Sequence, residues 1–105
     1  METKLTPLFI KTLAEKFDFM TIFFLDLKSK GVMAIGAIAD CKNLQTLDLS
    51  RNMIQSLSGL EQCIELKYLN LSYNKISTAT VLEACVKLHK LELQGNKISE
   101  FKSLP

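Results

Sequence analysis

The sequence predicts an α/β solenoid of four stacked repeats, and three observations lead to this fold class. One pattern of apolar residues recurs every 22 residues, most clearly in 44–65 and 66–87. Within each copy, apolar and polar residues alternate, which predicts a short strand with one buried face. The apolar residues that follow recur at intervals of three, which favours a 3₁₀-like return segment over a second strand. Each unit is therefore expected to contain one strand, and parallel strands from successive units should form a concave sheet opposite a convex side of 3₁₀ turns and loops.

The first element, residues 1–21, is expected to be an N-terminal helical cap. Thr6 and Pro7 are typical of a helix start, because threonine caps free amides and proline is preset for the first helical position. Phe9, Leu13 and Phe17 then recur at helical spacing. A terminal unit of a solenoid leaves its core open to water, so this helix should lie across that end. A partner-binding or membrane-surface helix is less favoured, because its polar face carries no excess of basic residues.

The repeats that follow are assigned to residues 22–43, 44–65, 66–87 and 88–105. The two clearest units share their core pattern, with Leu44, Leu47, Leu49, Asn52 and Ile54 in one and Leu66, Leu69, Leu71, Asn74 and Ile76 in the next. An inward asparagine amide can satisfy backbone groups that the bend leaves unpaired. In the first unit Lys30 replaces this asparagine and Gly31 follows, so we expect its turn to be closed by the backbone freedom of glycine.

This pattern, Leu-x-x-Leu-x-Leu-x-x-Asn-x-Ile, resembles the leucine-rich repeat. The continuation through Leu57, Leu60 and Cys63 resembles the 22-residue subclass typified by the protein phosphatase 1 regulatory leucine-rich subunit. That subclass includes ciliary proteins and the leucine-rich subunit of the U2 spliceosomal particle. The resemblance covers roughly residues 22–105 and implies a protein-interaction function. Because these residues build the core, and members of the family bind unrelated partners, the resemblance does not name a partner.

The three cysteines, Cys41, Cys63 and Cys85, are 22 residues apart and occupy one position of successive units. Side chains that project in parallel do not meet the geometry of a disulfide, and three is an odd number. The lone His89 falls in a different column, so the spacing does not favour a metal site. Buried, reduced thiols are expected, which fits a reducing compartment.

Composition and motifs give a catalytic function little support, and no cofactor is expected. The four glycines are scattered, so no glycine-rich phosphate loop is present. An open sheet excludes no water from its carboxylates. A net charge of +2 makes no general case for nucleic acid or acidic membrane. The longest apolar run, 31–39, is too short to span a bilayer, and residues 1–4 do not open a signal peptide. We expect a soluble cytoplasmic protein, with a ciliary, centrosomal or nuclear location left open.

The outward positions of the strands provide the candidate binding surface. Its eight residues are Phe24, Asp26, Thr46, Asp48, Tyr68, Asn70, Lys90 and Glu92. Neighbouring parallel strands lie about 4.8 Å apart, so like charges along the column of Asp26, Asp48 and Glu92 should repel, and folding should gain nothing from them. Beside Phe24 and Tyr68, these acids predict a site for a basic, partly apolar protein segment. The next column, with Ser50 and Ser72, is also expected to face outward.

We therefore expect a non-catalytic adaptor that binds a partner protein on the concave face and makes no membrane contact. The alternatives are a ribonucleoprotein subunit or a regulatory subunit of a phosphatase. Lys28, Lys30, Lys42 and Arg51 would supply a margin for RNA, but they are interleaved with acids, which makes nucleic acid a less favoured partner. The last unit stops short of 22 residues, so we expect the repeats to continue in a longer protein, or an uncapped edge that promotes self-association.

Overall fold

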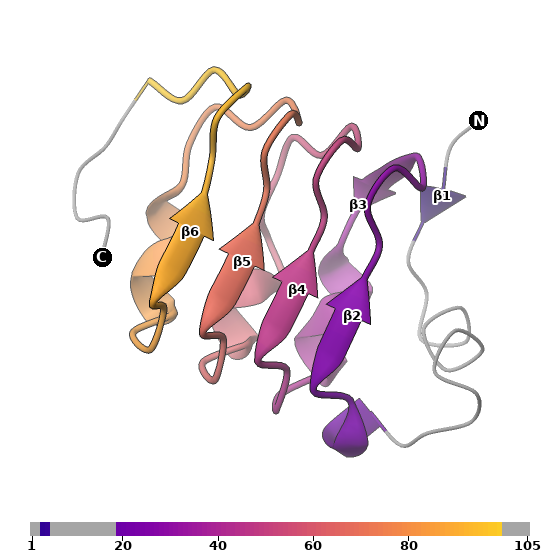
Figure 1. Cartoon of the computed structure of the whole chain (residues 1–105), viewed down its shortest axis with the longest axis vertical. Helices are drawn as coiled ribbons and strands as arrows, with labels where there is room; N and C mark the ends of the chain where they lie inside the picture. The colour runs from indigo at the N-terminus through magenta and orange to yellow at the C-terminus, as the bar shows by residue number, and fades with distance from the viewer. Residues whose placement is uncertain (1–2, 5–18, 100–105) are drawn as a thin grey trace.

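The computed structural model describes residues 3–4 and 19–99 and shows a parallel sheet of four short strands (Figure 1). The strands are β2 (Phe24–Asp26), β4 (Thr46–Asp48), β5 (Tyr68–Asn70) and β6 (Lys90–Glu92), in the order β2-β4-β5-β6. Each residue pairs with the residue 22 positions further on, as Leu25 does with Leu47 and Leu47 with Leu69. The predicted parallel sheet and its register are therefore confirmed.

Short 3₁₀ segments form the wall behind the sheet (Figure 1). They are η2 (Gly36–Asp40), η3 (Leu60–Gln62) and η4 (Thr80–Ala84), and a further one, η1 (Phe19–Thr21), precedes β2. None of these described helices is long and apolar enough to cross a bilayer. The described residues contain no α-helix, and the helix expected between Thr6 and Phe17 lies outside them. The α part of the predicted fold class therefore stays a prediction.

The first unit contains a second strand that the sequence analysis did not expect. Strand β3 (Val32–Ala34) pairs in parallel with β1 (Thr3–Lys4) in a separate two-stranded sheet. The expectation of one strand per unit is wrong here. Gly31, at φ 70°, turns the chain directly before β3. Because the partner strand comes from the N-terminal segment, the spacing of residues within 22–43 carried no signal of it.

Leucine side chains fill the space between the sheet and the 3₁₀ wall. The middle residue of each inner strand points inward, and Leu47 and Leu69 are fully buried. In the last unit, Leu91 and Leu93 are only half-buried and pack against the edge of the same core. Full burial of such a side chain contributes about 1.5 to 3 kcal/mol. The inner units therefore supply more of this stabilisation than the last one.

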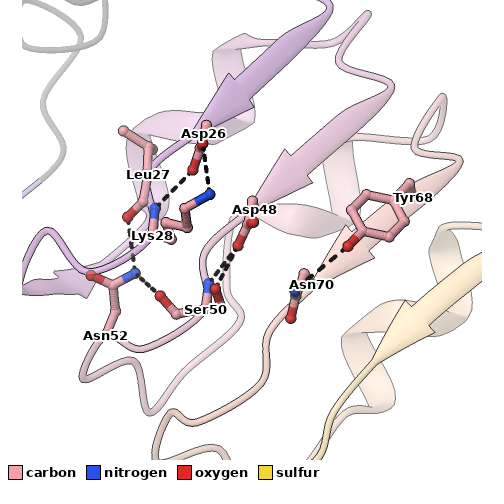
Figure 2. Close-up of polar contacts among 8 residues, drawn as sticks. All are labelled: Asp26, Leu27, Lys28, Asp48, Ser50, Asn52, Tyr68 and Asn70. Carbon is pink, nitrogen blue, oxygen red and sulfur yellow. Dashed lines mark hydrogen bonds and ion pairs between the residues drawn. The ribbon is translucent and has the colours of Figure 1, made fainter.

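Asparagines at the bend join each unit to the unit before it. The Oδ1 atom of Asn52 accepts hydrogen bonds from the backbone N–H groups of Lys30 at 3.0 Å and Val32 at 2.9 Å. Its Nδ2 donates to the carbonyl of Leu27 at 3.0 Å, as Figure 2 shows. Asn74 likewise accepts from a backbone N–H of the preceding unit and donates to one of its carbonyls. The predicted inward amides are therefore confirmed.

The bend of the first unit is closed differently from our expectation. Gly31 does adopt a positive φ, yet the amide of Asn52 in the next unit also holds this turn. The exposed Lys30 occupies the position that asparagine takes in the later units. The Oδ1 atom at this position serves the preceding unit, and no repeat precedes this one in the described residues. Among the residues that the structure describes, an amide at position 30 would therefore have no preceding turn to close.

The three cysteines lie in the core, as predicted, and all are free thiols. The Sγ atom of Cys63 donates to the carbonyl of Ile38 at 3.5 Å, and that of Cys85 to the carbonyl of Leu60 at 3.5 Å. Burial raises the pKa of Cys63 to about 12 and that of Cys41 to about 11. These thiols therefore pack as small apolar groups and stay protonated near neutral pH.

We expect a thiol reagent to label the native protein slowly at about pH 8, because thiolate is the reactive form and burial disfavours it. After addition of denaturant, all three cysteines should react quickly. The measurement is the time course of labelling by mass spectrometry. A Gln55→Cys variant, which adds one thiol at an exposed position, provides the control. Reaction of the native cysteines at the rate of that control thiol would contradict their assignment to the core.

Candidate functional site

The structure brings the eight predicted site residues together on the outer face of the sheet, here called the sheet face. They form two rows that run across the strands, Phe24, Thr46, Tyr68 and Lys90 in one and Asp26, Asp48, Asn70 and Glu92 in the other. Phe24, Asp26 and Lys90 are exposed, and the remaining residues are half-buried. The predicted columns are therefore real, whereas their role in binding stays a prediction.

Two residues of the second row close the turn at the end of their own strand. The Oδ1 atom of Asp48 accepts from the backbone N–H of Ser50 at 3.0 Å and from its hydroxyl at 2.7 Å (Figure 2). Asn70 makes the same two contacts with Ser72, at 3.0 and 2.7 Å. These bonds draw both serines inward, so that they are 7% and 4% exposed. The expectation that Ser50 and Ser72 face outward is therefore wrong.

Asp26 makes a variant of this contact with Lys28. Its carboxylate accepts from the backbone N–H of Lys28 at 3.2 Å and pairs with the Nζ at 3.3 Å, as Figure 2 shows. The backbone hydrogen bond is the main cause that lowers the pKa of Asp26. Dominant repulsion from a neighbouring carboxylate would raise that pKa. The premise that folding gains nothing from this row is therefore wrong, because Asp26 and Asp48 both help to close a turn.

Glu92 lies in register with the second row, but its side chain bonds differently and joins a cluster across β5 and β6. The hydroxyl of Tyr68 donates to Oε2 of Glu92 at 2.7 Å, and Nζ of Lys90 lies 5.5 Å from the centroid of the Tyr68 ring. This hydrogen bond is the main cause that lowers the pKa of Glu92 and raises the pKa of Tyr68. Asn70 adds a longer contact to the Tyr68 hydroxyl at 3.5 Å (Figure 2). The cluster holds an aromatic ring between an acid and a base.

Exposed apolar side chains gather near β2, at the other end of the sheet, beside the Asp26–Lys28 pair. Met20, Phe23 and Phe24 are 47%, 50% and 63% exposed. Phe24 was among the predicted outward residues, whereas Met20 precedes the first predicted repeat, so the repeat spacing gave no signal of its exposure. The described residues hold no group of three or more His, Cys, Asp or Glu side chains arranged to bind a metal ion. The face therefore offers apolar contact beside the Asp26–Lys28 pair near β2, and charged hydrogen bonding in the Tyr68–Glu92 cluster across β5 and β6.

Comparison with protein families gives two matches that together extend over all the described strands of the four-stranded sheet. The family described as "Leucine rich repeat" matches residues 21–76, and the one described as "Leucine Rich repeats (2 copies)" matches residues 64–105. No curated protein matches the sequence significantly.

Two solved structures of internalins from Listeria monocytogenes are similar to this chain. Internalin C2 is 34% identical, with a TM-score of 0.77, over 78% of this chain and 36% of the internalin. A second internalin, inlF, is 24% identical, with a TM-score of 0.80, over 88% of this chain and 30% of its own length. The second likeness shows the fold alone. The chain spans about a third of the length of either internalin.

Proposed function

The chain belongs to the leucine-rich repeat family, and from that premise we propose that it is a non-catalytic adaptor that binds a segment of a partner protein on the sheet face. Domains of this family generally mediate protein–protein interaction. The observation that carries the proposal is the in-register pairing that unites exposed Phe24 with the Tyr68–Glu92 cluster on one continuous face. The buried, free thiols of the core support a reducing, intracellular location.

The chemistry of the sheet face indicates what the partner segment contains. Asp26, Asp48 and Glu92 favour a basic segment, because opposite charge on an open surface steers encounter. Phe24 and the ring of Tyr68 favour apolar or aromatic side chains in the same segment, since large aromatic residues are frequent anchors of interfaces. Three strand spacings of about 4.8 Å separate β2 from β6. A partner segment that contacts all four strands must therefore extend over about 14 Å, the distance from β2 to β6.

We also propose that the chain belongs to the 22-residue subclass of leucine-rich repeats. The 22-residue register and the 3₁₀ segments η2, η3 and η4 support membership of the subclass typified by the protein phosphatase 1 regulatory leucine-rich subunit. That subclass includes adaptors with different partners, so affinity purification followed by mass spectrometry is the experiment that identifies the partner of this chain.

We expect the double variant Asp48→Asn with Glu92→Gln to fold as stably as the wild type and to retain the partner less well. Stability should hold because Asn70 already closes the same turn with an amide oxygen. Binding should weaken mainly through slower association. The matched control is Asp40→Asn with Glu83→Gln, which removes two exposed acids from the 3₁₀ wall. A partner that is kept by the wild type and the control, and reduced by the sheet-face variant, supports the proposal.

Replacement of Tyr68 tests the aromatic anchor. Tyr68→Ala should speed dissociation of the partner, whereas Tyr68→Phe keeps the ring and removes the hydroxyl with its contacts to Glu92 and Asn70. Surface plasmon resonance with the purified partner measures both rates. If the charge variant and Tyr68→Ala both bind as the wild type does, the sheet face is not the site. The 3₁₀ side then becomes the better candidate, because Ile64 and Val86 are 50% and 75% exposed there.

A further inference from the structure

A second charged surface lies along the edge of the solenoid that follows the C-terminal ends of the strands. We call it the basic rim, and its four exposed cations are Lys30, Arg51, Lys75 and Lys97. The segments that carry them, 28–34, 50–57, 72–79 and 94–99, contain no acidic residue. The ion pairs of the described residues are Lys28 with Asp26 and Lys87 with Glu65, so they involve none of these four. The four segments of the rim therefore carry basic charges without acids, whereas Lys28 and Lys90 lie beside the acids of the sheet face.

Hydrogen bonds between units fix the positions of these cations. The backbone N–H of Arg51 donates to the carbonyl of Ser72 at 2.9 Å. Those of Lys75 and Lys97 donate to the carbonyls of Ile54 and Ile76, at 2.9 and 3.1 Å. With units spaced about 4.8 Å apart, the rim from first to last spans about 14 Å. Only the side chains need to be ordered when a ligand binds.

An aromatic ring stands in the middle of the basic rim. Tyr73 is 48% exposed and has a φ of 59°, and the guanidinium carbon of Arg51 lies 4.5 Å from its ring centroid. On the other side the ring lies against Gly95, where any Cβ would collide with it. Arg51 and Gly95 therefore hold the ring from both sides. A fixed, half-exposed ring among cations offers an apolar contact in addition to charge.

We propose that the basic rim is a second docking surface, which binds an extended acidic segment of a partner protein. At about 3.3 Å per residue, a rim of about 14 Å fits four to five extended residues. Charge complementarity to the four cations selects acidic side chains, and Tyr73 accommodates one apolar side chain among them. This ligand has the opposite charge to the one proposed for the sheet face, so the two surfaces take different segments.

A nucleic acid fits the rim less well than an acidic peptide. Proteins that bind nucleic acid with a large electrostatic term make about six to ten phosphate contacts, whereas the described rim offers four cations. Binding of single strands also uses several aromatic side chains in succession. The described rim has one exposed aromatic residue, Tyr73. These counts favour a short acidic peptide.

The test is an NMR titration of the ¹⁵N-labelled full chain with a capped peptide of alternating Glu and Asp residues around a central Phe. Shifts should concentrate at the amides of Arg51, Tyr73, Lys75 and Lys97. The double variant Lys75→Gln with Lys97→Gln should weaken binding about tenfold, which corresponds to about 1.4 kcal/mol, because it removes two of the four exposed charge contacts. The matched control is Lys42→Gln with Lys67→Gln, which removes two exposed cations that precede β4 and β5. It should change the affinity less than about twofold.

Three results would overturn the proposal. The first is equal weakening by the rim variant and its control, which means that only net charge matters. The second is the absence of shifts at the rim, and the third is tighter binding of a uridine hexamer than of the peptide at the same residues. Asp48→Asn with Glu92→Gln should leave peptide affinity unchanged or slightly higher. A failure at the rim is therefore distinguishable from a failure of the proposed sheet-face function.

Discussion

Replacement of Asn52 by alanine is expected to lower the free energy of unfolding by about 3 to 5 kcal/mol. The amide makes five hydrogen bonds to backbone groups, and it is only 7% exposed. Alanine leaves the part-buried N–H of Lys30 and the buried N–H of Val32 without this acceptor, and it removes the donor for three backbone carbonyls. A buried group that loses its partner costs about 1 to 3 kcal/mol, and a part-buried one costs less. Partial entry of water should keep the total below the simple sum. Chemical denaturation monitored by circular dichroism measures the change.

Asn96→Ala is the matched control for this prediction. Asn96 occupies the equivalent position in the last unit, but it is half-buried and makes three such bonds. We expect a loss of about 1 to 2 kcal/mol there, because water can replace bonds that are partly exposed. Equal, small losses at Asn52 and Asn96 would show that the amide row contributes little to stability.

The second large effect is expected from Leu69→Ala, which should cost about 2 to 5 kcal/mol. Leu69 is fully buried and lies between Leu47 on β4 and Leu91 on β6. Its loss removes apolar contact with two neighbouring units and leaves a cavity. Because domains of this kind are stable by only about 5 to 15 kcal/mol, the melting temperature should fall clearly.

Leu91→Ala gives the comparison for Leu69→Ala. Leu91 has the same place in β6, yet it is half-buried, so the same truncation should cost less than at Leu69. A melting temperature that is unchanged by Leu69→Ala would contradict the strand register. A larger loss at Leu91 than at Leu69 would contradict the burial gradient along the solenoid.

The sheet and its core were predictable because a strand with one buried face has a single favourable pairing register. Leu47 and Leu69 recur at the spacing of the repeat, and a slip by one residue would turn each of them to solvent. Strand β3 was not predictable in this way, because its partner Thr3–Lys4 lies in another part of the chain and is only two residues long.

The two rows of the candidate site were predictable from the register, but their local bonding was missed. A polar residue at a strand end can face either solvent or its own backbone two residues on. The recurrence of Asp48 with Ser50 and of Asn70 with Ser72 was the signal for the second alternative, since short polar side chains of this kind close turns. The bond between Tyr68 and Glu92 depends on side-chain rotamers across two strands, which residue spacing does not specify.

The amide row has a consequence for how the protein is made. The first three bends are each completed by an asparagine that lies about one repeat further along the chain, as Lys30 is served by Asn52, 22 residues later. Ribosomes add about 5 to 20 residues per second, so a newly emerged unit waits roughly one to four seconds for the residue that completes it. Folding should therefore trail translation by one repeat, and a nascent chain stalled between Lys30 and Asn52 should leave its first bend open.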